Sequence, residues 1–67
     1  MHHDTSLDYV ARINRTVDYI VGHLEEPLTL DVLAGVACFS PFHFHRVFRL
    51  LMGEPVKQFV KRLRLEW

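Results

Sequence analysis

The chain has 67 residues, of which 49% are hydrophobic and 24% charged, so a single globular domain is expected and disorder is not. The only cysteine, Cys38, excludes an internal disulfide and fits a reducing, cytoplasmic setting. No apolar run approaches the roughly 20 residues that a membrane span needs, and the first residues do not resemble a signal peptide, so no membrane partner is expected.

Charge is unevenly distributed along the chain, although the formal net charge is zero. Residues 1–34 hold two basic and six acidic side chains, a net charge of −4, whereas residues 35–67 hold six basic and two acidic ones, a net charge of +4. Such asymmetry favours one basic face, which suits a polyanionic partner. An ordinary solvated surface would give the same counts.

Apolar residues recur at helical spacing in four segments, and no strand pattern is present. The first predicted helix spans about residues 7–24 and ends before Pro27, since the residue preceding a proline avoids the helical region. Its apolar stripe comprises Tyr9, Val10, Ile13, Val17, Ile20, Val21 and Leu24. The second spans about residues 29–37, with Thr29 as N-cap. Its predicted inner face comprises Leu30, Leu33, Ala34 and Ala37.

The third helix is predicted over residues 40–52, with Ser40 as N-cap and Pro41 in the first turn, and with Gly53 as its stop. Its predicted buried residues are Phe44, Val47, Phe48 and Leu51. The fourth is predicted over residues 55–67. Its apolar face comprises Val56, Phe59, Val60 and Leu63. The expected fold is all-α, a small homeodomain-like helix-turn-helix bundle of three helices plus the start of a fourth.

The second and third helices, joined by a turn at residues 38–39, form a helix-turn-helix pattern, whose second helix can enter the major groove of DNA. Helical hairpins in ordinary bundles share this pattern. The outward-facing residues of the third helix are predicted to be Phe42, His43, Arg46 and Arg49, with His45 on the flank. Arg46 suits bidentate reading of guanine, and Arg49 suits a phosphate. Phe42 either packs on a thymine methyl group or forms a hydrophobic staple against the turn.

Two stretches closely resemble bacterial transcription regulators of the AraC/XylS family: EPLTLDVLA at residues 26–34 and FSPFHFHRVFR at residues 39–49. The resemblance covers about residues 10–66. Members of this family have two helix-turn-helix subdomains joined by a long linker helix. The resemblance therefore implies that residues 1–67 form the first subdomain, that the second subdomain is absent, and that residues 55–67 begin the linker helix.

The same resemblance implies residue roles in binding double-stranded DNA through the major groove. Its base-reading candidates are Phe42, His45 and Arg46. Its weaker candidates, for contacts with the DNA backbone, are Ser40, His43, Arg49 and Arg62. Two departures stand out from the family pattern. Cys38 occupies a position that usually holds glycine, and Pro55 replaces the usual Ser or Thr cap of the linker helix, so Glu54 is expected to substitute as the cap.

No catalytic, metal or cofactor site is expected, so an enzyme is not predicted. His43 and His45, two positions apart on a helix, diverge by about 200° and cannot chelate one ion, while His2, His3 and His23 would assist only by accident. The alternative is a protein–protein interaction module, or a regulator fragment without its own DNA binding. In that case the apolar end of the fourth helix, at Leu65 and Trp67, would mediate self-association.

Overall fold

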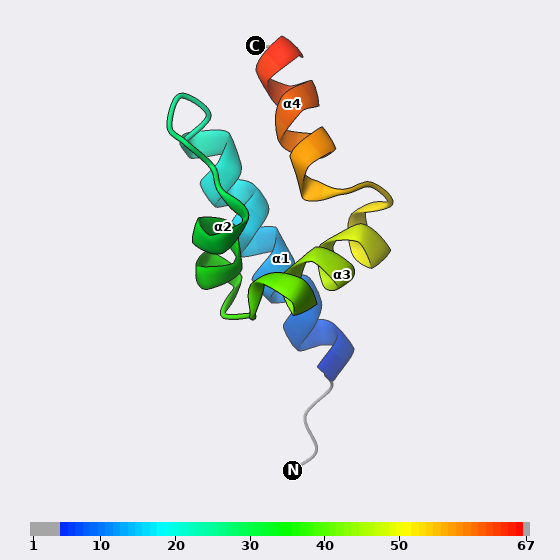
Figure 1. Cartoon of the computed structure of the whole chain (residues 1–67). Helices are drawn as coiled ribbons and strands as arrows, with labels where there is room; N and C mark the ends of the chain where they lie inside the picture. The colour runs from blue at the N-terminus through cyan, green and yellow to red at the C-terminus, as the bar shows by residue number, and fades with distance from the viewer. Residues whose placement is uncertain (1–4, 67) are drawn as a thin grey trace.

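Four helices build the fold in the computed structural model, which describes the backbone of residues 5–66 and the side chains of residues 8–66. In chain order they are α1 (Thr5–Gly22), α2 (Leu30–Ala37), α3 (Pro41–Met52) and α4 (Val56–Glu66) (Figure 1). Helices α1, α2 and α3 contact one another pairwise, and α4 contacts α3. The all-α helix-turn-helix prediction is confirmed. None of the described helices is long and apolar enough to cross a membrane.

The hydrophobic core lies between α1, α2 and α3 and continues onto the first turns of α4. Phe44 and Phe48 of α3 are fully buried, and their ring centroids lie 5.6 Å apart. Phe48 also meets Phe59 of α4 edge to face at 5.5 Å, which ties α4 to α3. Each buried phenylalanine stabilises the fold by about 1.5–3 kcal/mol. The other buried hydrophobic residues are Ile13, Ile20, Leu33, Ala34, Ala37, Val47, Val56 and Val60.

Two leucines that were predicted to be buried are largely exposed. Leu51 is 45% exposed because the last turn of α3 extends past α1 and α2 (Figure 1). Leu30 is 39% exposed because it faces an open groove between α2 and α4 instead of the core. Conversely, Thr16 is completely buried, and its hydroxyl donates to the Arg12 carbonyl at 2.9 Å, so no unsatisfied polar group results.

The apolar stripe and end of α1 also differ from the prediction. Val10 and Val21 are 39% and 46% exposed, since the bundle covers only one side of α1. The helix ends at Gly22, two residues before the predicted end, and Leu24 packs against the core from the following turn.

The cap of α4 differs from the prediction as well. The first backbone hydrogen bond of α4 runs from the Phe59 N–H to the Pro55 carbonyl, so Pro55 stands at the N-cap position. Glu54, which was expected to substitute for the usual cap, pairs with the guanidinium of Arg62 instead. This carboxylate is paired with an arginine in the second turn of α4, and among the described residues it makes no hydrogen bond with an amide of the first turn.

The turn between α2 and α3 depends on a left-handed residue. Cys38 has φ 60° and ψ 39°, a left-handed conformation that agrees with its place at a position where the family pattern usually has glycine. Its N–H donates to the Gly35 carbonyl at 3.1 Å, and the next N–H, of Phe39, donates to the Ala34 carbonyl at 2.9 Å. This pair of bonds is a Schellman motif, which closes a helix and reverses the chain. Helix α3 starts at once, because the Ser40 hydroxyl accepts from the His43 N–H at 3.3 Å.

Replacing Cys38 with glycine is expected to raise the free energy of unfolding by up to about 1 kcal/mol, because glycine adopts positive φ without the steric cost of a Cβ. Chemical denaturation followed by circular dichroism measures the change. Cys38→Ala is the matched control: it removes the thiol, keeps the Cβ and should not stabilise the protein. A loss of stability in Cys38→Gly would show that the thiol packing outweighs the backbone strain.

Candidate nucleic-acid interface

Three side chains form an exposed ridge along α3. Phe42 is 72% exposed, and Arg46 and Arg49 are also exposed. The ridge residues follow one another at spacings of four and three, which places them on one face of the helix, away from the buried phenylalanines. The Arg46 guanidinium carbon lies 6.0 Å from the centroid of the Phe42 ring. This ridge of Phe42, Arg46 and Arg49 presents an apolar surface, planar hydrogen-bond donors and positive charge together.

The remaining predicted residues of α3 lie beside the ridge in different settings. Ser40 caps the helix. His43 is exposed, and its Nε2 lies 3.1 Å from the Tyr9 hydroxyl of α1. His45 is half-buried and lines the groove between α2 and α4. The structure therefore brings Phe42, Arg46 and Arg49 together, ties His43 to α1 and turns His45 towards α4.

Arg62 differs from the arginines of the ridge because carboxylates surround it. Its guanidinium pairs with Glu54 and lies 3.6 Å from the carboxylate of Glu66. It also lies 5.5 Å from the centroid of the Phe59 ring. The hydrogen bond that Arg62 donates to Glu54, followed by the negative charge of that residue, raises the pKa of Arg62 above its ordinary value. The charge of Arg62 is thus compensated by nearby carboxylates. Arg46 and Arg49, in contrast, have no acidic partner among the described residues.

An open groove of about 700 Å³ lies between α2 and α4, and helical periodicity alone does not predict it. Lys57 and Lys61 line the groove, and no carboxylate of the described residues does. Its apolar lining comprises Leu28, Leu30, Leu33, Pro55, Val56, Val60 and Leu65. Arg64 closes one side, since its guanidinium donates to the carbonyls of Leu24 at 3.0 Å and Glu26 at 2.8 Å. The sequence feature that points to this groove is the number of leucines, which exceeds the number that the core buries.

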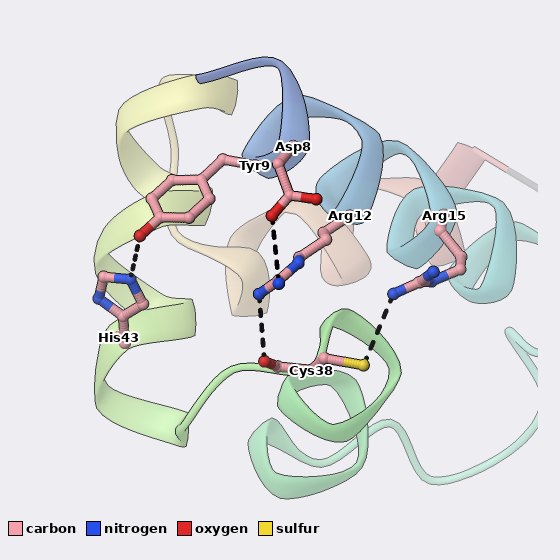
Figure 2. A network of polar contacts seen from close by, with 6 residues as sticks. All are labelled: Asp8, Tyr9, Arg12, Arg15, Cys38 and His43. Carbon is pink, nitrogen blue, oxygen red and sulfur yellow. Dashed lines mark hydrogen bonds and ion pairs between the residues drawn. The ribbon is translucent and has the colours of Figure 1, made fainter. Parts of the chain in front are cut away.

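Two arginines of α1 hold the turn that precedes α3 (Figure 2). Arg12 donates to the Cys38 carbonyl at 3.3 Å, pairs with Asp8 at 3.1 Å, and lies 4.9 Å above the Phe39 ring. Arg15 donates to the Val36 carbonyl at 3.2 Å and reaches the Cys38 Sγ at 3.7 Å. Carbonyls at a helix C-terminus lack partners within the helix and carry partial negative charge, so these cations suit them.

This role of Arg12 and Arg15 cannot be predicted from the sequence, because their acceptors lie more than twenty residues away along the chain. Only the packing of α1 across the end of α2 brings them together. In a sequence pattern such arginines are indistinguishable from solvated surface charge.

Replacing Arg15 with alanine is expected to lower the free energy of unfolding by about 0.5–1 kcal/mol, since an exposed hydrogen bond to the end of α2 is lost. Urea denaturation at constant ionic strength measures the change. Arg49→Ala serves as the control, because the Arg49 side chain has no partner among the described residues and its loss should leave stability unchanged. Equal stability of the two variants would contradict a role for Arg15 in the turn.

Known proteins resemble the chain along most of its length, although no family model matches it. It is 33% identical over 57 residues to the HTH-type transcriptional regulator YbfP of Bacillus subtilis, a match that covers 85% of the chain and 19% of that protein. It is 30% identical over 59 residues to the right origin-binding protein of Escherichia coli, covering 88% and 20%. The transcriptional activator AarP of Providencia stuartii is 32% identical over 53 residues, covering 79% and 39%.

The helix-turn-helix fold and these matches together define the class of the chain: a helix-turn-helix unit of the type found in transcriptional regulators. Over most of its length the chain is homologous to helix-turn-helix regulators of the AraC/XylS family, as the stretches around residues 26–34 and 39–49 had indicated. The chain spans about a fifth of the length of YbfP and of the right origin-binding protein.

Among the side chains of residues 8–66, no three His, Cys, Asp or Glu groups come close enough to hold a metal ion. His2 and His3, considered above as accidental metal ligands, and Trp67, considered as part of a self-associating end, lie outside the described residues.

Proposed function

We propose that the chain binds double-stranded DNA without catalysing a reaction, and that α3 enters the major groove. The observation that carries this proposal is the exposed ridge of Phe42, Arg46 and Arg49 on the second helix of the helix-turn-helix. The Phe42 ring is 72% exposed and does not pack against the core cluster, so it is available for an external contact beside the two arginines. Homology to transcriptional regulators supports DNA as the partner.

Each ridge residue suits a different part of the duplex. Arg46 has the planar fork that matches O6 and N7 of guanine, and its guanidinium lies beside the Phe42 ring. The Phe42 ring itself suits the methyl group of thymine. Arg49, one turn further from the N-terminus of α3, suits a phosphate, which positions the helix without reading sequence.

The other candidates are assigned to the edges of the interface. The Ser40 hydroxyl accepts a bond from the backbone and still has its own proton to donate to a phosphate. His43 is a further donor towards the DNA backbone. His45 is half-buried at the groove between α2 and α4, so it is the least accessible of the base-reading candidates. Arg62 is already held by two carboxylates, so we assign its main role to the link between α3 and α4.

A second candidate function is self-association through the groove and the outer face of α4. Leu65 is 78% exposed and Leu30 39% exposed, and both line the groove. Sedimentation of the free chain distinguishes this function from the first. A dimer that binds no duplex at low salt would favour the interaction module over the DNA-binding unit.

Arg46→Ala is expected to weaken binding to a specific duplex by about 1–3 kcal/mol and to relax the preference for one base pair. Arg49→Ala is expected to weaken binding to all duplexes alike, because a phosphate contact carries no sequence information. A family of duplexes selected from a randomised pool, titrated by fluorescence anisotropy, measures both. If both variants lose the same binding free energy, independent of the duplex sequence, then Arg46 does not read a base.

DNA binding by the 67-residue chain is expected to be weak and strongly salt-dependent, since it offers a single recognition helix. If three or four phosphates are neutralised, log affinity should fall with log salt at a slope of roughly −3. A salt titration with a fluorescent duplex measures the slope, and sedimentation under the same conditions controls for self-association. Tight, salt-insensitive and sequence-selective binding by the monomer would contradict this expectation.

A further inference from the structure

A cluster of three aromatic rings connects α1 to the start of α3. Tyr9 and Phe39 meet edge to face with ring centroids 5.1 Å apart, Phe39 and His43 at 5.0 Å, and Tyr9 and His43 at 5.6 Å. The Arg12 guanidinium covers the Phe39 ring and so anchors the middle of the cluster. The His43 imidazole therefore rests against two rings from other segments, although the residue is exposed to solvent.

The two ring nitrogens of His43 have different surroundings. Nε2 lies 3.1 Å from the Tyr9 hydroxyl, whereas the other ring nitrogen points away from α1 and from the turn (Figure 2). In a neutral imidazole one nitrogen carries the proton and the other accepts, and the hydrogen bond made by one decides the state of the other. The environment of Nε2 therefore controls whether Nδ1 can donate.

We propose that Tyr9 is a positioning residue of the DNA interface, which acts by fixing the tautomer and the orientation of His43. A phenol is the better donor and a neutral imidazole nitrogen the better acceptor, so the Tyr9 hydroxyl donates to Nε2. The imidazole proton then resides on Nδ1, and an N–H group faces outward beside the ridge of α3. This donor suits a phosphate oxygen of DNA. The inference rests on the proposed function for its ligand.

Without the phenol, nothing among the described residues would hold the proton on Nδ1. Nε2 would then be open to water, and the tautomer with the proton on Nε2 would become accessible. That tautomer presents only an acceptor at Nδ1, which a phosphate oxygen repels. The loss of one hydroxyl on α1 would thus remove a donor on α3, although the hydroxyl itself does not contact DNA.

Nitrogen-15 NMR of the imidazole side chains, without DNA and at about pH 8.5 where an ordinary imidazole is neutral, reads the tautomer directly. The wild-type chain should show His43 protonated on Nδ1, and Tyr9→Phe should shift the His43 population towards the Nε2-protonated form. Tyr19→Phe is the matched control, because Tyr19 stacks on His23 elsewhere on α1 and should leave His43 unchanged.

Fluorescence titrations of a duplex then test the effect on binding. Tyr9→Phe should weaken binding by roughly two- to tenfold, the range of one hydrogen bond, with Tyr19→Phe again unaffected. In a His43→Ala background, Tyr9→Phe should cause no further loss, because Tyr9 acts through His43. Circular dichroism establishes that each variant is folded before it is compared.

Either of two results overturns the proposal: a wild-type His43 protonated on Nε2, or a loss from Tyr9→Phe that is as large without His43 as with it. Failure of the wild-type chain to bind any duplex overturns the proposed function and the phosphate contact with it. The NMR result is independent of DNA, so it separates that failure from an error about Tyr9.

Discussion

The left-handed turn at Cys38 is the constraint on which the helix-turn-helix depends. The two bonds of the Schellman motif end α2, and Ser40 begins α3 two residues later, so the direction of α3 follows from a very short segment. A residue with a Cβ is strained at φ 60°. Tertiary contacts must therefore stabilise the turn, because its own conformational preference does not.

Those contacts come from α1, which serves both the core and the surface. Its buried side, with Ile13 and Ile20, packs against α2 and α3. Its polar edge supplies Arg12 and Arg15 to the free carbonyls at the end of α2. Through Phe39 the same edge continues to His43 on α3. The orientation of the proposed recognition helix is thus connected, contact by contact, to the first helix of the chain.

The basic half of the chain divides into cations with internal partners and cations without them. Arg62 is compensated by Glu54 and Glu66, and Arg64 donates to two carbonyls in the segment between α1 and α2. Lys57 and Lys61 line the groove, and Arg46 lies on the ridge. The net charge of residues 35–67 therefore overstates the positive charge that a polyanion would meet, because part of it stabilises the placement of α4.

The number and order of the helices, the caps at Thr29 and Ser40, and the outward direction of Phe42 can all be predicted from the sequence. These features follow from spacings of three and four residues and from side-chain bonds to nearby amides, which are local. The positive φ of Cys38 was foreseen from a glycine-like position in the family pattern.

The packing of the helices determines which residues of an apolar stripe are covered and which charges are paired. Leu30 and Leu51 fit the helical period, yet Leu30 faces the open groove between α2 and α4, and Leu51 lies on the last turn of α3, past α1 and α2. The partners of Arg12, Arg15 and Arg64 are 21 to 40 residues distant in the chain. Helical periodicity predicts which side of a helix is apolar. The position and length of the neighbouring helices determine which residues of that side are buried in contacts.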